Sequence, residues 1–509
     1  MKKHYEVIVL GRSIGALVAA ALLARRDFTV LLLGNGAPAA AYEAAGFSFR
    51  RRASTFLAGA SPAWARVVSE LAQSQTWKRR TRPATPMLQT LSAGRRFEIP
   101  ADPALFSREV NREFSELFRL VEQLYTDLGS VNAAADEAFD HDLTWPPGTF
   151  WERRAAAKVV SALPYVHAEL DFDVLSDFPR GHFYRQLVRA SVLFGTHLSS
   201  MPPPFAVARL HGAWTRGLLE LTGGEEELES FLVDRVRAHG GECVMGARAA
   251  ALHLKRGGAA GVLIDGDDQP TGCDFVLTDS EGEALAALAG GQGIHKRALR
   301  EWPRITSTVG RFVVSLVART DGVPQPLGPE SLVFARENPW QGRDRPAVVH
   351  LQRTDLGSGR TLLVAELLLP DNSALSMTDA RAFVLRTLEA ELPFLGRHLC
   401  AVDSPHDGLP VWIYEGGARR LLDRESARVP PLEPMIRQLE VDPPGYLGLA
   451  GEPARGPIER TLLLGRSVLP GLGQEGELLA AWSAARLVTR SDKKKALMRR
   501  DMWNKMEFG

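Results

Sequence analysis

The stretch VIVLGRSIGALVAAALLARRDFTVLLL, residues 7–33, decides the fold of this chain. Residues 5–10 are apolar and rich in valine and isoleucine, which predicts a buried strand. A tight turn at 11–16 precedes an Ala- and Leu-rich helix that ends in two arginines, and a second buried strand follows at 28–33. A βαβ order within about thirty residues is the setting that a dinucleotide-binding fingerprint requires.

The fingerprint itself is incomplete. The pattern G-x-G-x-x-G falls on Gly11, Ser13 and Ala16. The first glycine is present and alanine is acceptable at the third position, but a serine at the second obstructs the approach of a pyrophosphate to the backbone. Gly15 relieves some of this crowding but lies one residue before the third position, and Gly34 stands where an acidic residue would bind a ribose. The segment is therefore either a working nucleotide site or a Rossmann-type βαβ unit that has lost its ligand contacts.

The composition limits the class of protein. A chain of 509 residues is long enough for two or more domains, and 45% hydrophobic with 24% charged residues is ordinary for a globular protein. A net charge of +1 gives no electrostatic preference for nucleic acid. The three cysteines form no CxxC pair, so we expect neither a zinc site nor a disulfide framework, and a cytoplasmic location is natural. No charge-free window reaches the length of a membrane span.

The rest of the sequence predicts one mostly helical region and the strands of two sheets. Residues 56–205 read as mostly helical, and the segment SMPPP at 200–204 marks the return to the first domain. A helix at 226–239 precedes Gly240-Gly241 and short strands at 243–245, 252–255, 261–264 and 274–278. A second sheet is predicted from strands at 305–317, 331–335, 347–352 and 361–369.

Four segments in this order resemble the phytoene desaturase and flavin amine oxidase superfamily. They are the first βαβ, AAGFSFRRRASTF at 44–56, the Gly-Gly helix-and-strand segment at 212–266, and RTLLLGRSVLPGLGQEGELLAAWSAARLV at 460–488. The resemblance implies an α/β fold in which a discontinuous Rossmann-like FAD-binding domain carries an inserted α+β substrate domain. The first domain would comprise residues 1–70, 206–300 and 430–509, and the second, the substrate or lid domain, 71–205 and 301–429.

The departures from the family pattern fall on cofactor contacts. Besides Ser13 and Gly34, Arg50 replaces an aspartate of the family, and Arg466 replaces the aspartate of the closing Gly-Asp. The sequence Leu-Gly-Arg-Ser at 10–13 is repeated at 464–467, and in the family both turns face one cofactor. The arginines then either grip a dinucleotide phosphate or fill a pocket that no longer holds one. The predicted cofactor-binding residues are Gly11, Arg12, Ser13, Gly15, Ala16, Gly34, Gly465, Arg466, Gly471 and Gly473.

Two functions follow from the resemblance. The first is an FAD-dependent oxidoreductase that abstracts hydride from a lipophilic or amine substrate, with the flavin carrying the redox step. The alternative is a flavin-free pseudo-oxidoreductase that acts as a binding or scaffold protein, as Rab GDP-dissociation inhibitors do. The sequence singles out no catalytic side chain and no metal-ligand spacing.

The chain ends in SDKKKALMRRDMWNKMEFG, residues 491–509, which combines lysines and arginines with apolar residues at helical spacing. Such a segment either lies on an anionic membrane as a peripheral contact or docks as a helix on its own domain.

Overall fold

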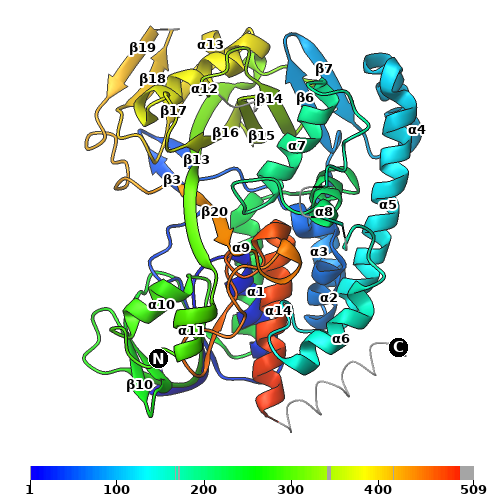
Figure 1. Ribbon diagram of the computed structural model, residues 1–509. Helices are drawn as coiled ribbons and strands as arrows, with labels where there is room; N and C mark the ends of the chain where they lie inside the picture. The colour runs from blue at the N-terminus through cyan, green and yellow to red at the C-terminus, as the bar shows by residue number, and fades with distance from the viewer. Residues whose placement is uncertain (1, 167, 170–171, 341–345, 417, 493–509) are drawn as a thin grey trace.

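A computed structural model describes residues 2–166, 168–169, 172–340, 346–416 and 418–492 (Figure 1). The predicted basic tail therefore lies almost entirely outside the described residues. In the described ranges, no helix combines the length and the apolar character that crossing a membrane requires. The division of the chain at residues 70, 205, 300 and 429 stays a prediction.

The first sheet has seven strands in the order β10-β11-β12-β1-β2-β9, with β21 beside β12. Strands β21, β12, β1, β2 and β9 run parallel, and β10 and β11 form an antiparallel edge. The bounds are β1 His4–Leu10, β2 Val30–Leu33, β9 Glu242–Val244, β10 Ala249–Lys255, β11 Gly258–Ile264, β12 Thr271–Thr278 and β21 Thr461–Leu463. This is the predicted Rossmann-like sheet, in which the carboxyl ends of the parallel strands meet at one edge.

The helix α1 (Ile14–Arg25) is buried from Gly15 to Ala24 because it is apolar on all sides. Ser13 is its N-cap, and the serine hydroxyl accepts a hydrogen bond from the amide of Ala16 (3.3 Å). The helix packs against α9 (Gly224–Ala238) and α14 (Gly473–Ser491), which lie beside it in Figure 1. The serine that breaks the fingerprint thus has a structural task at the start of the helix.

Most of residues 56–205 is helical, as predicted. The helices are α2 Pro62–Glu70, α3 Ser74–Arg80, α4 Pro103–Glu113, α5 Phe118–Asp140, α6 Phe150–Val160 and α7 Phe183–Gly195, and α8 Pro204–Thr215 follows. The prediction missed β5 (Thr81–Pro83) and the hairpin of β6 (Leu88–Ser92) and β7 (Arg95–Ile99). Positive φ angles of 50° at Ala93 and 79° at Gly94 form the two-residue turn of this hairpin.

The second sheet has ten strands in the order β19-β18-β17-β13-β16-β15-β14-β6-β7, with β20 beside β13. All four predicted strands are present, and the long strand β13 joins the upper and lower parts of the molecule in Figure 1. The bounds are β13 Arg304–Arg319, β14 Glu330–Phe334, β15 Val348–Gly357, β16 Arg360–Pro370, β17 Leu399–Asp403, β18 Val411–Glu415, β19 Ala418–Leu422 and β20 Ile436–Asp442.

Smaller elements complete the two layers. They are β3 Ala41–Ala44, β4 Phe47–Arg50, β8 Leu219–Leu221, α10 Gly282–Leu288, α11 Lys296–Glu301, α12 Met377–Glu391 and α13 Leu395–His398. Helix α12 packs on one face of the second sheet, where its Phe383, Val384 and Leu388 share a core with alternate residues of β13, β15 and β16. Because side chains along a strand alternate between faces, the residues in between point to the opposite face, where Val313 and Val364 pack against the β3/β4 hairpin and Leu368 joins the core of the first sheet.

His211 on α8 is buried with its Nδ1 atom 2.8 Å from the Ser191 hydroxyl and its Nε2 atom 3.1 Å from the Tyr125 hydroxyl. Burial lowers the pKa of this imidazole from 6.5 to about 4. Between these values the unfolded chain binds a proton that the native state does not, so acid weakens the fold.

We therefore expect the free energy of unfolding to fall as the pH drops below 6.5, with His211 contributing up to about 1.4 kcal/mol per pH unit. Urea denaturation of the His211→Gln variant should show a shallower pH slope than the wild type, and His253→Gln, at an exposed position on β10, is the matched control. Equal slopes for wild type and His211→Gln would contradict a buried neutral histidine.

Candidate functional site

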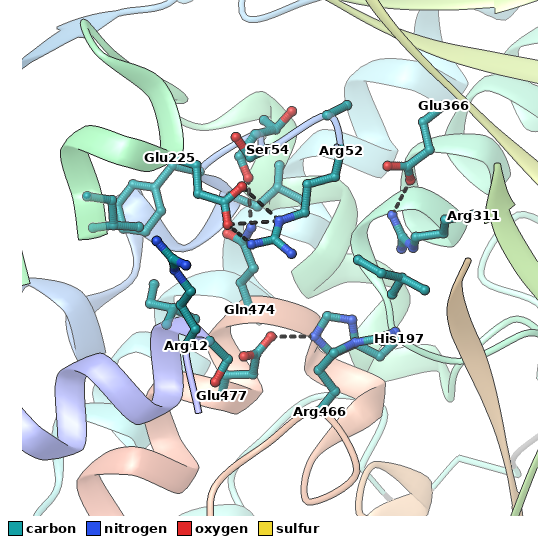
Figure 2. A pocket seen from close by; sticks show the side chains of 18 of the residues that line it. Arg12, Arg52, Ser54, His197, Glu225, Arg311, Glu366, Arg466, Gln474 and Glu477 are labelled. Atoms are coloured by element: carbon teal, nitrogen blue, oxygen red, sulfur yellow. Dashed lines mark hydrogen bonds and ion pairs between the residues drawn. The ribbon is translucent and has the colours of Figure 1, made fainter. Parts of the chain in front are cut away.

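A cavity of about 300 Å³ lies between the carboxyl edge of the first sheet and the inner face of the second (Figure 2). Its wall comes from the turn before α1, the segment at 52–57, the end of α7, helices α9 and α14, and the sheet strands β13, β15 and β16. The sheet contributes Arg311, His350 and Glu366, which are the strand residues that point away from the α12 core. Strand alternation therefore places three polar side chains on one side of the cavity.

Three of the four arginines on the cavity wall are already paired with glutamates. The pairs are Arg12 with Glu229 through two hydrogen bonds (2.8 and 2.7 Å), Arg52 with Glu225, and Arg311 with Glu366 (2.5 Å). Such charge-assisted pairs fix the geometry of both partners. The protein itself therefore neutralises most of the positive charge that the sequence places here.

Asp279 directly follows β12, and its side chain reaches the turn before α1. Its Oδ2 atom accepts hydrogen bonds from the amides of Arg12 (3.0 Å) and Ser13 (2.8 Å), and burial raises the pKa of the carboxyl group. A Cβ atom on Gly11 would overlap this carboxylate, and a Cβ on Gly465 would overlap the carbonyl group of the same residue. The two Gly-Arg-Ser turns therefore enclose one aspartate, which explains why both begin with glycine.

His197 and Glu477 form a second polar pair on the wall, with 2.8 Å between Nε2 and Oε1. Burial and the nearby charge of Arg466 lower the pKa of His197 to about 4, so the imidazole is neutral at pH 7. The neutral imidazole of His197 faces the Glu477 carboxylate through Nε2, so its proton is on Nε2 and this nitrogen donates the hydrogen bond. Glu477 lies in the first turns of α14, so the helix end that would favour a bound anion already faces a carboxylate of the protein.

Arg466 differs from the other arginines. Its Nη2 atom donates to the carbonyl oxygen of Arg437 (2.8 Å), and no carboxylate lies within ion-pair distance among the described residues. Burial and repulsion by Arg311 lower the pKa of its guanidinium to about 10.

The predicted cofactor residues divide into two groups. Arg12, Ser13 and Arg466 line the cavity, whereas the others pack against the protein. A Cβ on Gly34 would overlap the Met245 carbonyl, and a Cβ on Gly473 would overlap that of Gly195. Gly15 similarly approaches the Leu464 carbonyl, Gly471 the backbone of Leu449, and the Ala16 amide is used by the N-cap. A cofactor-binding role for these residues stays a prediction.

The sequence reasoning missed Asp279, the glutamate partners, His197 and Arg311. A usable signal existed for Asp279 alone, because it directly follows the predicted strand at 274–278 and ligand sites lie at the carboxyl ends of such strands. No group of three or more His, Cys, Asp or Glu side chains in the described ranges is arranged to hold a metal ion.

Comparison with known proteins supports the fold. Residues 9–71 match the family described as NAD(P)-binding Rossmann-like domain. A comparison with curated proteins gives no match. Among solved structures, the chain is similar to an oxidoreductase from Methanosarcina mazei (14% identity, TM-score 0.55, over 94% of this chain and 99% of that one). It is also similar to cyclohexylamine oxidase from Brevibacterium oxydans (14%, 0.53, 96% and 99%) and to a putrescine oxidase redesigned in its cofactor binding (13%, 0.54, 96% and 99%).

These likenesses extend over almost the whole length of the chain. They show that it has the Rossmann-containing α/β fold of FAD-dependent oxidoreductases, amine oxidases among them. The predicted resemblance to the phytoene desaturase and flavin amine oxidase superfamily is confirmed at the level of the fold.

FAD is the cofactor that this fold implies, and the residues present do not fit it. The carboxylate of Asp279 accepts from the amides of Arg12 and Ser13 at the N-terminus of α1, where a phosphate would need donors, and Glu229 and Glu477 add two further carboxylates to the cavity wall. The backbone leaves no room at Gly34 for the ribose-binding acid. A volume of about 300 Å³ is at the lower end of the ~300–1,000 Å³ typical of pockets for ligands smaller than a dinucleotide.

The role of Asp279 can be tested by two substitutions. Asp279→Asn keeps an oxygen that can accept from both amides and should therefore cost less stability than the loss of the acceptor. Asp279→Ala leaves the amides of Arg12 and Ser13 without an acceptor and should lower the free energy of unfolding by about 2–3 kcal/mol. Chemical denaturation measures both, and equal stability of the two variants would show that the amides do not need the carboxylate oxygen.

Proposed function

We propose that this protein is a flavin-free member of the oxidoreductase fold, whose cavity between the two sheets binds a small molecule without a dinucleotide. The observation that carries the proposal is Asp279, which binds two amides of the glycine turn. An amide that already donates to a buried carboxylate is not available to a phosphate, and the carboxylate repels one. This corresponds to the second of the two functions that the sequence allows.

The charge pattern of the wall supports the same conclusion. A protein that grips a pyrophosphate with Arg12 would keep this guanidinium free, whereas both its Nε and its Nη2 atoms bind Glu229. Helix α9 begins with Glu225, Glu226 and Glu227, which suit a helix N-terminus and pair with Arg52, Arg50 and Arg80. The helix end nearest the cavity is thus already occupied by carboxylates of the protein and their arginine partners.

The proposal predicts that the purified full-length protein is colourless and shows no saturable binding of FAD in a fluorescence titration. Stoichiometric flavin absorbance, or tight binding of added FAD, would overturn it.

A triple variant tests whether the carboxylates on the cavity wall are what prevents FAD from binding. Asp279→Asn, Glu229→Gln and Glu477→Gln together remove three negative charges with little change of shape. If repulsion excludes the phosphates, this variant should bind FAD or ADP measurably more tightly than the wild type, by about tenfold or more. Glu415→Gln, at an exposed site on β18, is the control that alters charge far from the cavity.

A second candidate is an FAD-dependent oxidoreductase that acts on a lipophilic or amine substrate. It is favoured by likeness to two amine oxidases over 96% of the chain. The same FAD titration separates the candidates, because this activity requires that the wild-type protein hold the flavin.

A further inference from the structure

We propose that the cavity binds a small lipophilic carboxylic acid whose carboxylate is held by Arg466. The inference rests on the proposed function, since it takes the cavity as the ligand site of a flavin-free protein. It goes further by assigning the chemical class of the ligand and the residue that recognises it.

The first argument is the hydrogen-bonding capacity of Arg466. A guanidinium carries five N–H donors, and among the described residues the hydrogen bond to the Arg437 carbonyl is the one that Arg466 makes. The side chain lines the cavity and keeps its positive charge, because arginine is not deprotonated in proteins. Its remaining donors match the two oxygens of a carboxylate, which arginine binds through parallel hydrogen bonds.

The other charged groups near Arg466 do not supply that carboxylate. Arg311 is committed to Glu366 and to the carbonyl oxygens of Phe194 and Thr196. Glu477 accepts from His197 and lies outside ion-pair distance of Arg466.

Arg52 and Glu281 are the remaining charged groups that act on this guanidinium, and Arg52 is paired with Glu225. Each carboxylate on the cavity wall already has a donor, while Arg466 has none of its charge neutralised by an ion pair in the described chain. Burial and repulsion by Arg311 outweigh the attraction of Glu477 and Glu281 and lower the pKa of Arg466, and a bound anion would oppose that shift.

The surroundings of Arg466 indicate a ligand with an apolar body. Ile436 and Phe194 line the same cavity as Arg466 and contribute apolar surface to its wall. Trp214 adds an indole fixed by a hydrogen bond from Nε1 to the Ser191 carbonyl (2.9 Å). Leu57 also lines the cavity. Pockets of this size bind small molecules through apolar surface and a few polar groups that fix the orientation of the ligand.

A single charge favours a carboxylic acid over a phosphate ester. One guanidinium without a partner balances one negative charge, and Glu477 and Asp279 nearby would repel a second. An amine is the opposite case, because a cation beside Arg466 and Arg311 would be repelled. The class of ligand is therefore distinguishable by three probes of equal chain length.

The test is calorimetric titration of the full-length protein with octanoate, octanol and octylamine, and with inorganic phosphate. We expect octanoate to bind at least tenfold more tightly than octanol, and octylamine and phosphate not to bind. Equal binding of octanoate and octanol, tighter binding of octylamine or phosphate, or no binding of octanoate would overturn the assignment. The comparison needs no variant and therefore does not depend on the folding of one.

Variants locate the contact. Arg466→Gln should weaken octanoate binding by about 10- to 100-fold and leave octanol binding unchanged, and Arg466→Lys should recover part of the loss. Arg420→Gln, in an exposed ion pair with Glu415, is the matched control and should bind like the wild type. Thermal unfolding of each variant confirms that it is folded, and undiminished octanoate binding by folded Arg466→Gln would contradict the role of Arg466.

The FAD titration distinguishes failure of the flavin-free function from failure of the carboxylic acid assignment. A protein that binds neither FAD nor octanoate leaves the flavin-free function standing and removes the carboxylic acid. A protein that binds FAD removes the flavin-free function itself.

Discussion

The carboxylate of Asp279 is the constraint on which the arrangement around the cavity depends. Asp279 follows β12, its carboxylate binds the turn that follows β1, and its backbone lies against the turn that follows β21, so that one residue joins the ends of three parallel strands. The same contacts set the start of α1 and the position of Arg466 after Gly465. A group placed at such a junction shapes the site without touching a ligand, and its negative charge decides which ligands the site accepts.

Much of the fold could be predicted from the sequence because it depends on local patterns. The apolar runs at 5–10 and 28–33 predicted buried strands of the first sheet, and the segments at 305–317 and 361–369 predicted strands of the second. The hairpin of β6 and β7 was missed because its strands are short and its turn is formed by Ala93 and Gly94 rather than by an Asn-Gly pair. Its place in the sheet depends on pairing with β14, far along the chain.

The site was harder to predict for a physical reason. Arg12 and Arg466 were recognised as lining one pocket, but their partners come from elsewhere in the sequence. Glu229 is 217 residues from Arg12, and Asp279 is 267 residues from the amide that it accepts. In the sequence, the glutamates of a helix such as α9 cannot be distinguished from those of a solvent-exposed face. Their arginine partners become evident only in the folded structure. The choice between arginines that hold a phosphate and arginines that fill a pocket is thus a question of tertiary pairing.

The packing of Gly34 against Met245 bears on how such a protein could change. The amide of Gly34 bonds to the Val244 carbonyl (3.3 Å), and its Cα approaches the Met245 carbonyl too closely for any side chain. A carboxylate cannot be regained at this position by one substitution, because the backbone of β9 would first have to move away from β2. Substitutions that replace the arginines by acidic residues would leave this backbone contact in place. They would therefore not restore the contact between an acidic residue and a ribose.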